Sequence, residues 1–121
     1  MKIKHFEDIE SWKKSRELVR EIYEQFKAVR DYGFKDQIQR AAVSVMCNIA
    51  EGFDRGSNKE FIQFLVISRG SVSEVKSLSY SALDLGYINN KVFAEISERC
   101  VTLINLINGF IRYLKNSDRK R

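Results

Sequence analysis

The chain of 121 residues has no proline, a single histidine and only two cysteines. Because proline interrupts helices, its absence lets helices run long, and turns must be made by glycine and short polar residues. Cys47 and Cys100 form neither a CxxC pair nor a disulfide framework, which is typical of a reducing cytoplasm. No apolar run approaches the ~18 residues of a membrane span and no signal peptide is recognisable, so we expect a cytoplasmic protein that does not enter a membrane.

The scarcity of histidine narrows the chemistry that the chain can support. The single histidine, His5, precedes the expected helices, whereas di-metal sites in helical bundles need Glu-x-x-His motifs on facing helices. No histidine is therefore placed to act as a base within a helix, and none follows an arginine, as the Arg–His motif of helical ribonucleases requires. No glycine-rich phosphate loop occurs. We expect a protein that is not an enzyme and has no catalytic residue, cofactor or metal ligand.

The remaining composition is ordinary for one soluble domain. Hydrophobic residues make up 44% and charged residues 31%, which is typical of a globular chain and not of a disordered one. The length fits a single domain over residues 1–121 with one core. A formal net charge of +5 and a pI of about 9.3 favour anionic partners, although a basic surface that serves only solubility would explain them equally well.

Apolar residues recur at spacings of three and four along four segments, which predicts four helices. We expect these helices at about 7–30, 35–54, 58–85 and 90–115, followed by a basic tail at 116–121. Long helices with short connections fold back on one another, so the predicted fold class is all-α, an antiparallel up-down four-helix bundle. The clearest periodicity is in the last helix, where the spacing holds through Phe93, Ile96, Cys100, Leu103, Ile107, Phe110 and Leu114.

Glycine and short polar residues mark the expected turns. Ser57 and Glu60 have the S-x-x-E spacing of a capping box at the start of the third helix. Glycine is favoured where a helix ends, because it adopts a left-handed backbone conformation without steric cost. We expect Gly33 to adopt such a conformation between the first two helices. The predicted turn and capping residues are Gly33, Gly52, Gly56, Ser57, Gly86 and Asn89.

The third and fourth helices carry more apolar positions than one inward face can bury. A surface helix of a monomer needs one apolar stripe a little over ~100° wide, and additional exposed apolar patches usually mark subunit contacts. Singly exposed apolar residues would be the alternative explanation. Two glycines inside the helices suggest close approach by a neighbouring helix. The candidate interface residues of a homo-oligomer are Ile62, Val66, Gly70, Tyr80, Leu106, Gly109 and Tyr113.

Polar side chains follow one edge of the second helix. Glutamine, serine and asparagine are poorer helix formers than lysine or glutamate, and their short amide and hydroxyl groups suit hydrogen bonds between helices or subunits. We expect Arg40 to pair with Glu51 and Glu74 near the buried side, as structural groups. This polar ridge, with one residue from the third helix, consists of Gln37, Arg40, Ser44, Asn48, Glu51 and Glu74.

Residues 37–52, QIQRAAVSVMCNIAEG, resemble the signature of a four-helix-bundle family, the 23S rRNA intervening sequence proteins. The family pattern is close to Q-I-x-R-A-A-x-S-I-x-x-N-I-A-E-G, and departures such as Val45 for isoleucine are conservative. The resemblance covers essentially the whole chain. Further matches are Trp12, Phe61–Leu65, Gly70 and Ser71 with Glu74, and Leu85–Tyr87.

The resemblance implies an antiparallel four-helix bundle that assembles into a ring-like homopentamer. Members of the family are encoded in insertions within bacterial large-subunit rRNA genes or as free-standing genes. The accessory variability protein of diversity-generating retroelements is similar; it has a basic surface and pairs with a reverse transcriptase. The resemblance thus implies a fold more firmly than a function.

We expect the chain to bind further copies of itself, and these observations suggest two kinds of additional partner. Ring symmetry would repeat each basic patch, which would favour weak, sequence-independent binding of RNA or DNA. The alternative is an oligomeric scaffold or accessory subunit for a protein partner such as a reverse transcriptase, and the sequence alone does not choose between the two. The candidate nucleic-acid contacts are Lys13, Lys14, Arg16, Arg112, Lys115, Arg119, Lys120 and Arg121.

Overall fold

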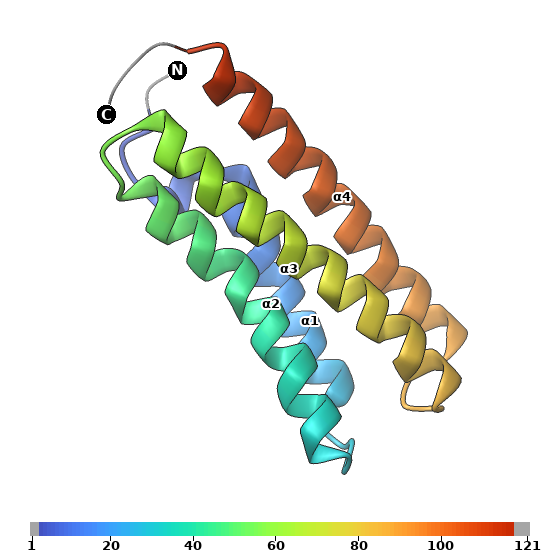
Figure 1. The fold of residues 1–121 in the computed structure, drawn as a ribbon. Helices are drawn as coiled ribbons and strands as arrows, with labels where there is room; N and C mark the ends of the chain where they lie inside the picture. The colour runs from blue at the N-terminus through green and yellow to red at the C-terminus, as the bar shows by residue number, and fades with distance from the viewer. Residues whose placement is uncertain (1–2, 118–121) are drawn as a thin grey trace.

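The computed structural model describes residues 3–117, which form a short 3-10 turn and four α-helices without a strand (Figure 1). Each helix packs against the next one, and α4 also packs against α1. The all-α, four-helix fold predicted from the sequence is confirmed. No helix in the described part of the chain is long and apolar enough to cross a membrane. The elements are η1 (Phe6–Asp8), α1 (Glu10–Phe26), α2 (Tyr32–Phe53), α3 (Asn58–Asp84) and α4 (Asn90–Lys115).

Short polar side chains start three of the helices. Asp31, Ser57 and Asn89 each accept a hydrogen bond from a backbone N–H in the first turn of α2, α3 and α4, which satisfies a donor that the helix leaves free. Ser57 also donates its hydroxyl hydrogen to the carboxylate of Glu60, at 3.3 Å. After α3, Gly86 adopts a φ of 77°, the left-handed conformation that glycine tolerates best.

The first turn differs from the prediction. The helix α1 ends at Phe26, four residues before the expected end, and α2 begins at Tyr32. Gly33 therefore lies inside the first turn of α2, and its backbone is not left-handed. The cap supplied by Asp31 explains the earlier start, because its carboxylate accepts the N–H of Phe34 at 3.2 Å.

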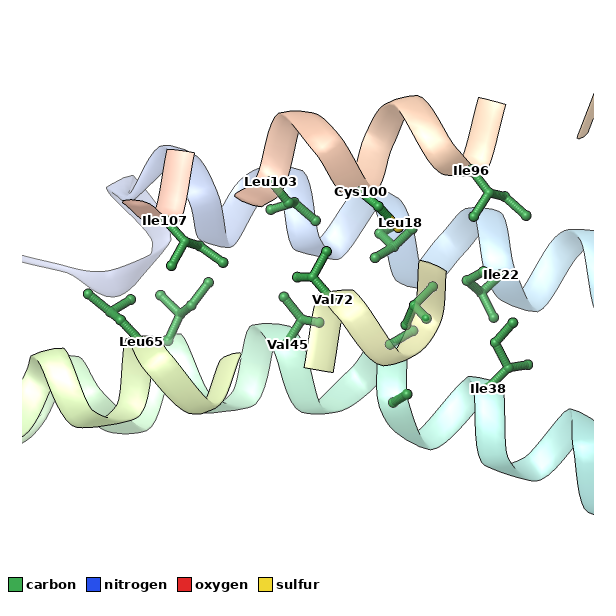
Figure 2. Close-up of a cluster of buried hydrophobic side chains, with 14 of the residues drawn as sticks. Leu18, Ile22, Ile38, Val45, Leu65, Val72, Ile96, Cys100, Leu103 and Ile107 are labelled. Carbon is green, nitrogen blue, oxygen red and sulfur yellow. The ribbon is translucent and has the colours of Figure 1, made fainter. Parts of the chain in front are cut away.

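The core runs along the axis of the bundle and receives side chains from all four helices (Figure 2). The apolar side chains that recur at spacings of three and four along α2, Ile38, Ala42, Val45 and Ile49, are completely buried, and so are the central positions of the α4 periodicity. Burying a side chain of this size contributes about 1.5–3 kcal/mol, so the shared core is the main source of stability. Residues labelled at its centre include Leu18, Ile22, Ile38, Val45, Leu65, Val72, Ile96, Cys100, Leu103 and Ile107.

Hydrogen bonds tie the turns together at both ends of the bundle. At one end, the Tyr87 hydroxyl in the α3–α4 turn donates to Asp31 in the α1–α2 turn, at 2.7 Å. At the other, the Asn58 amide at the start of α3 donates to the carbonyl oxygen of Ser117, at 3.3 Å. Figure 1 shows the α2–α3 turn at the same end as the beginning of α1 and the end of α4. These contacts fix the helices in one register.

Close helix approach occurs at a glycine that the sequence placed in a turn. Gly52 is buried in the last turn of α2, and a Cβ atom there would lie 2.7 Å from the Cβ of Phe64 on α3. Gly70 and Gly109, in contrast, have no backbone of another helix near them: a Cβ on Gly70 would meet no atom within 4 Å, and one on Gly109 would meet only the side chain of Arg112. Within one chain, the expected close approach at these two glycines is therefore wrong.

Candidate nucleic-acid interface

A row of cations occupies the solvent face of α1. Lys13, Arg16, Arg20 and Lys27, which directly follows the last residue of α1, are all exposed and fall within about 60° of the helix circumference, over about 21 Å along its axis. We call these four residues the α1 basic stripe. Among the described residues no carboxylate pairs with the first three, whereas Lys27 contacts Glu24 at 2.8 Å. Unpaired cations on one helix face are available to an anionic partner.

Two aromatic residues accompany the stripe in different ways. Trp12 is half-buried, with the ring of Phe6 packed edge-on at 5.2 Å and the Arg16 guanidinium 6.0 Å from its ring centre. Tyr23 lies at the edge of the stripe, about 20° beyond Arg16 around the helix and between Arg20 and Lys27 along it, and is 45% exposed. The Trp12 ring is thus packed between neighbouring side chains at the beginning of the stripe, whereas the ring of Tyr23 is accessible to solvent.

An acidic groove between α1 and α4 bounds the stripe on one side. Arg99 of α4 pairs there with Glu17 at 3.2 Å and reaches Glu21 at 3.8 Å. The hollow measures about 380 Å³ and is lined by Lys14, Glu17, Glu21, Glu95, Glu98, Arg99 and Thr102. Lys14 and Arg99 offset two of its four carboxylates, so the groove keeps a net negative charge and disfavours phosphates. No group of three or more residues in the described chain is arranged to hold a metal ion.

Only some of the predicted nucleic-acid contacts lie in the α1 basic stripe. Lys13 and Arg16 lie in the stripe, but Lys14 turns into the acidic groove, where it contacts Glu17 at 3.6 Å. Arg112 and Lys115 are exposed at the end of α4. Arg112 lies about 140° around that helix from Arg99, which faces α1, so these two cations do not extend the stripe. Arg119, Lys120 and Arg121 lie outside the described residues.

Part of the polar ridge joins α2 to α3. The hydroxyl groups of Ser44 and Ser71 are 2.9 Å apart, and the Asn48 amide donates to the carbonyl oxygen and to the hydroxyl of Ser44. Next to them, the buried Ser68 hydroxyl donates to the carbonyl oxygen of Val45 at 2.8 Å. The hydrogen bonds of Ser71 and Ser68 tie α3 to α2 on one side of the core, whereas those of Asn48 stay within α2.

The expected ion pair of the polar ridge is wrong for the single chain. Arg40 pairs with Asp36 one turn away on α2, at 2.7 Å, and Glu51 pairs with Arg55 in the turn that follows α2, at 3.0 Å. Arg40 and Glu51 are separated by about 16 Å along α2, too far for direct contact. Gln37, Arg40, Glu51 and Glu74 are all exposed. Contacts within one turn suffice to pair the charges, so none of them needs to be buried.

The candidate interface residues lie on two faces instead of one. Ile62, Val66, Gly70 and Tyr80 share an arc of about 80° on the outer side of α3. Leu106, Gly109 and Tyr113 share one flank of α4. Leu106 lies about 160° around the helix from Asn108, which accepts a hydrogen bond from Arg69 of α3. Ile62, Leu106 and Gly109 are half-buried within the chain, whereas Val66, Gly70, Tyr80 and Tyr113 are exposed.

Arg20 and Lys27 belong to the stripe but were not among the predicted contacts. The signal that would have found them is their position: they follow Arg16 by four and eleven residues, and such spacings return to the same side of a helix. A search for consecutive basic residues selects Lys13 and Lys14, which lie about 100° apart on the helix. Helical periodicity is thus a better guide to this surface than local charge density.

Comparisons with known proteins agree with this fold. A model of the 23S rRNA-intervening sequence protein family matches residues 7–109. A crystal structure from Bacteroides thetaiotaomicron, of a protein of unknown function in the S23 ribosomal protein family, is similar with a TM-score of 0.78 at 23% identity, over 84% of this chain and 98% of that one. No curated protein matches the chain. The family match covers α1 to α3 and most of α4, and the chain belongs to the 23S rRNA-intervening sequence protein family.

Proposed function

We propose that this protein is a non-catalytic, cytoplasmic, ring-forming homo-oligomer that binds RNA or DNA through the α1 basic stripe. The observation that carries the proposal is the row of three unpaired cations, Lys13, Arg16 and Arg20, on one exposed helix face. Each cation that neutralises a phosphate releases a condensed counterion, which favours binding irrespective of base sequence.

The two apolar faces support assembly into a ring. A closed ring is built from heterologous contacts, in which one surface of each copy meets a different surface of the next. The outer side of α3 supplies one such surface: among its exposed positions between Glu60 and Asp84, only Glu74 is charged. The flank of α4 with Leu106 and Tyr113 supplies the other. Five copies is the number that the family resemblance leads us to expect.

Assembly through these faces leaves the stripe free. Among the described residues α1 contacts α2 and α4 but not α3, so the outer sides of α1 and α3 point in opposite directions. Each subunit of a ring would then present its own stripe, and the symmetry would repeat the cations around the assembly. Repetition raises the effective concentration of binding sites for one long polyanion.

The experiment that tests the proposal compares three proteins in titrations of a fluorescent single-stranded RNA at low salt. They are the wild type, a stripe variant with Lys13, Arg16 and Arg20 changed to glutamine, and a control variant with Arg40, Lys59 and Lys91 changed to glutamine. Both variants lose three positive charges. We expect only the stripe variant to lose affinity, while light scattering shows an assembly near five times the 14.1 kDa chain mass for all three proteins.

A second candidate function is a scaffold for a protein partner, and the exposed apolar side chains favour it. Val66, Tyr80 and Val101 are between 42% and 52% exposed on α3 and α4, and such patches also bind other proteins. If the chain assembles in light scattering but binds no nucleic acid at low salt, the nucleic-acid function is contradicted and the scaffold function is favoured.

A further inference from the structure

We propose that the ring of Tyr23 stacks on an unpaired base, so that the α1 basic stripe binds single-stranded nucleic acid; this inference rests on the proposed function. Tyr23 is an exposed aromatic residue at the edge of the stripe. Arg20 precedes it by three residues and Lys27 follows it by four, and both spacings place side chains next to one another on a helix. The ring therefore lies between two cations on the same face.

The surroundings of Tyr23 leave its ring available for stacking. Among the described residues no other aromatic ring packs against it, and its side chain is 45% exposed. Trp12 lacks this freedom, because Phe6 packs against its ring and Arg16 lies over it. Hence the two aromatic residues differ in role: one stabilises the structure around the stripe, and the other faces the partner.

Such a ring discriminates between unpaired and paired bases. In a duplex the faces of the bases are covered by neighbouring base pairs, so a tyrosine on the phosphate-binding surface cannot reach them. A single strand exposes the faces of its bases, and aromatic side chains flanked by cations bind them with little dependence on sequence. A cationic stripe without an aromatic ring would bind both forms through their phosphates alone.

The test measures the affinity of three probes for three proteins. The probes are a single strand of about 12 nucleotides, a strand of the same length with abasic sites in place of all its bases, and a duplex. The proteins are the wild type, Tyr23→Leu, which keeps apolar bulk without a ring, and Tyr23→Phe, which keeps the ring. Melting curves of both variants verify the fold, which should persist because Tyr23 lies on the surface.

We expect the wild type and Tyr23→Phe to prefer the strand with bases over the abasic strand by at least about fivefold, the lower end for one base–aromatic stack. Tyr23→Leu should lose this preference and bind the duplex as the wild type does. A preference that persists in Tyr23→Leu, or an equal loss of affinity for all three probes, would overturn the inference while leaving the proposed function intact. Absence of binding to every probe at low salt would contradict the proposed function itself.

Discussion

The hydroxyl of Tyr87 donates a 2.7 Å hydrogen bond to the carboxylate of Asp31, and so connects the α3–α4 turn to the α1–α2 turn. The same carboxylate caps α2 through the N–H of Phe34, whose ring packs edge-on against Tyr87 at 5.4 Å. Asp31 and Phe34 thus join Tyr87, which is distant from both in the sequence, to close one end of the bundle.

This contact makes stability depend on pH in two regions. The hydrogen bond from Tyr87, followed by that from Phe34, lowers the pKa of Asp31 from 3.8, and the bond to Asp31 raises the pKa of Tyr87 from 10.0. A carboxyl group whose pKa is lowered by folding stabilises the fold at pH values above its pKa in the unfolded chain. This stabilisation is lost as the pH falls through its pKa in the folded protein. A tyrosine whose pKa is raised by folding stabilises the fold at pH values below its pKa in the unfolded chain. This stabilisation is lost as the pH rises through its pKa in the folded protein.

Replacing Tyr87 by phenylalanine keeps the ring and the Asp31 cap but removes the bond. We expect the wild type to exceed Tyr87→Phe in free energy of unfolding by a constant amount between about pH 5 and pH 9, and by less at both extremes. Urea denaturation across the pH range measures the difference. A difference that is the same from acid to alkali would show that the hydrogen bond does not carry the pH dependence.

Gly52 is predicted to tolerate no side chain. A Cβ atom would lie 2.7 Å from the Cβ of Phe64 and 2.8 Å from a ring carbon of Phe61. Overpacking of this kind costs about 1–3 kcal/mol, so Gly52→Ala should lower the free energy of unfolding although alanine favours helices. Gly33→Ala is the matched control: its nearest neighbour would be 4.0 Å away, and the better helix propensity should raise stability by up to about 1 kcal/mol. Equal effects of the two substitutions in denaturation would contradict the close approach.

The two cysteines should differ in reactivity. Cys47 is exposed on α2, whereas Cys100 is buried in the core, where burial raises the pKa of its thiol to about 12. Because the thiolate is the reactive form, iodoacetamide at pH 8 should label Cys47 in the folded protein and both cysteines after denaturation. Mass spectrometry of the labelled peptides distinguishes them. Rapid labelling of Cys100 in the folded state would mean that α4 opens far more readily than its packing implies.

The polar contacts between α2 and α3 should contribute unequally to stability. The Ser68 hydroxyl is completely buried and bonded to Val45, so Ser68→Ala should cost about 1 kcal/mol. Arg40 pairs with Asp36 in solvent, with 80% of its side chain exposed, so Arg40→Ala should change stability by less than about 0.5 kcal/mol. Denaturation at one fixed protein concentration measures the free energy of unfolding of both variants. A larger loss in Arg40→Ala would indicate that Arg40 is buried in an assembly.

Periodicity in the sequence was sufficient to predict the helices, and it failed where a contact depended on a distant residue. Ser57, Gly86 and Asn89 act locally, so their roles as caps could be read directly from their neighbours. The role of Gly52 depends on Phe64 in the next helix, a contact that no local pattern encodes. The start of α2 is instead a local signal of the same kind as Ser57 and Asn89, because Asp31 caps the helix through Phe34 three residues later. The spacing of apolar residues alone does not locate that start.

The candidate site was predictable to a smaller extent, because helix geometry decides which nearby residues share a face. Consecutive charges suggested Lys13 and Lys14 together, but adjacent residues point in different directions on a helix. Lys14 consequently faces Glu17, while Arg20 joins Lys13 on the solvent face. The expected pairing of Arg40 with Glu51 likewise overlooked nearer partners of opposite charge.

The salt dependence of RNA binding tests the central claim most directly. Titrations of a single-stranded RNA of about 12 nucleotides between about 50 and 200 mM salt give the slope of log affinity against log salt, to which each phosphate contact in a single strand contributes about 0.7. We expect the stripe variant, with Lys13, Arg16 and Arg20 changed to glutamine, to have a slope smaller by about 2 than that of the wild type. The control variant, with Arg40, Lys59 and Lys91 changed, should keep the wild-type slope. Equal slopes for the two variants, or no binding by the wild type at the lowest salt, would contradict the assignment of α1 as the nucleic-acid-binding surface.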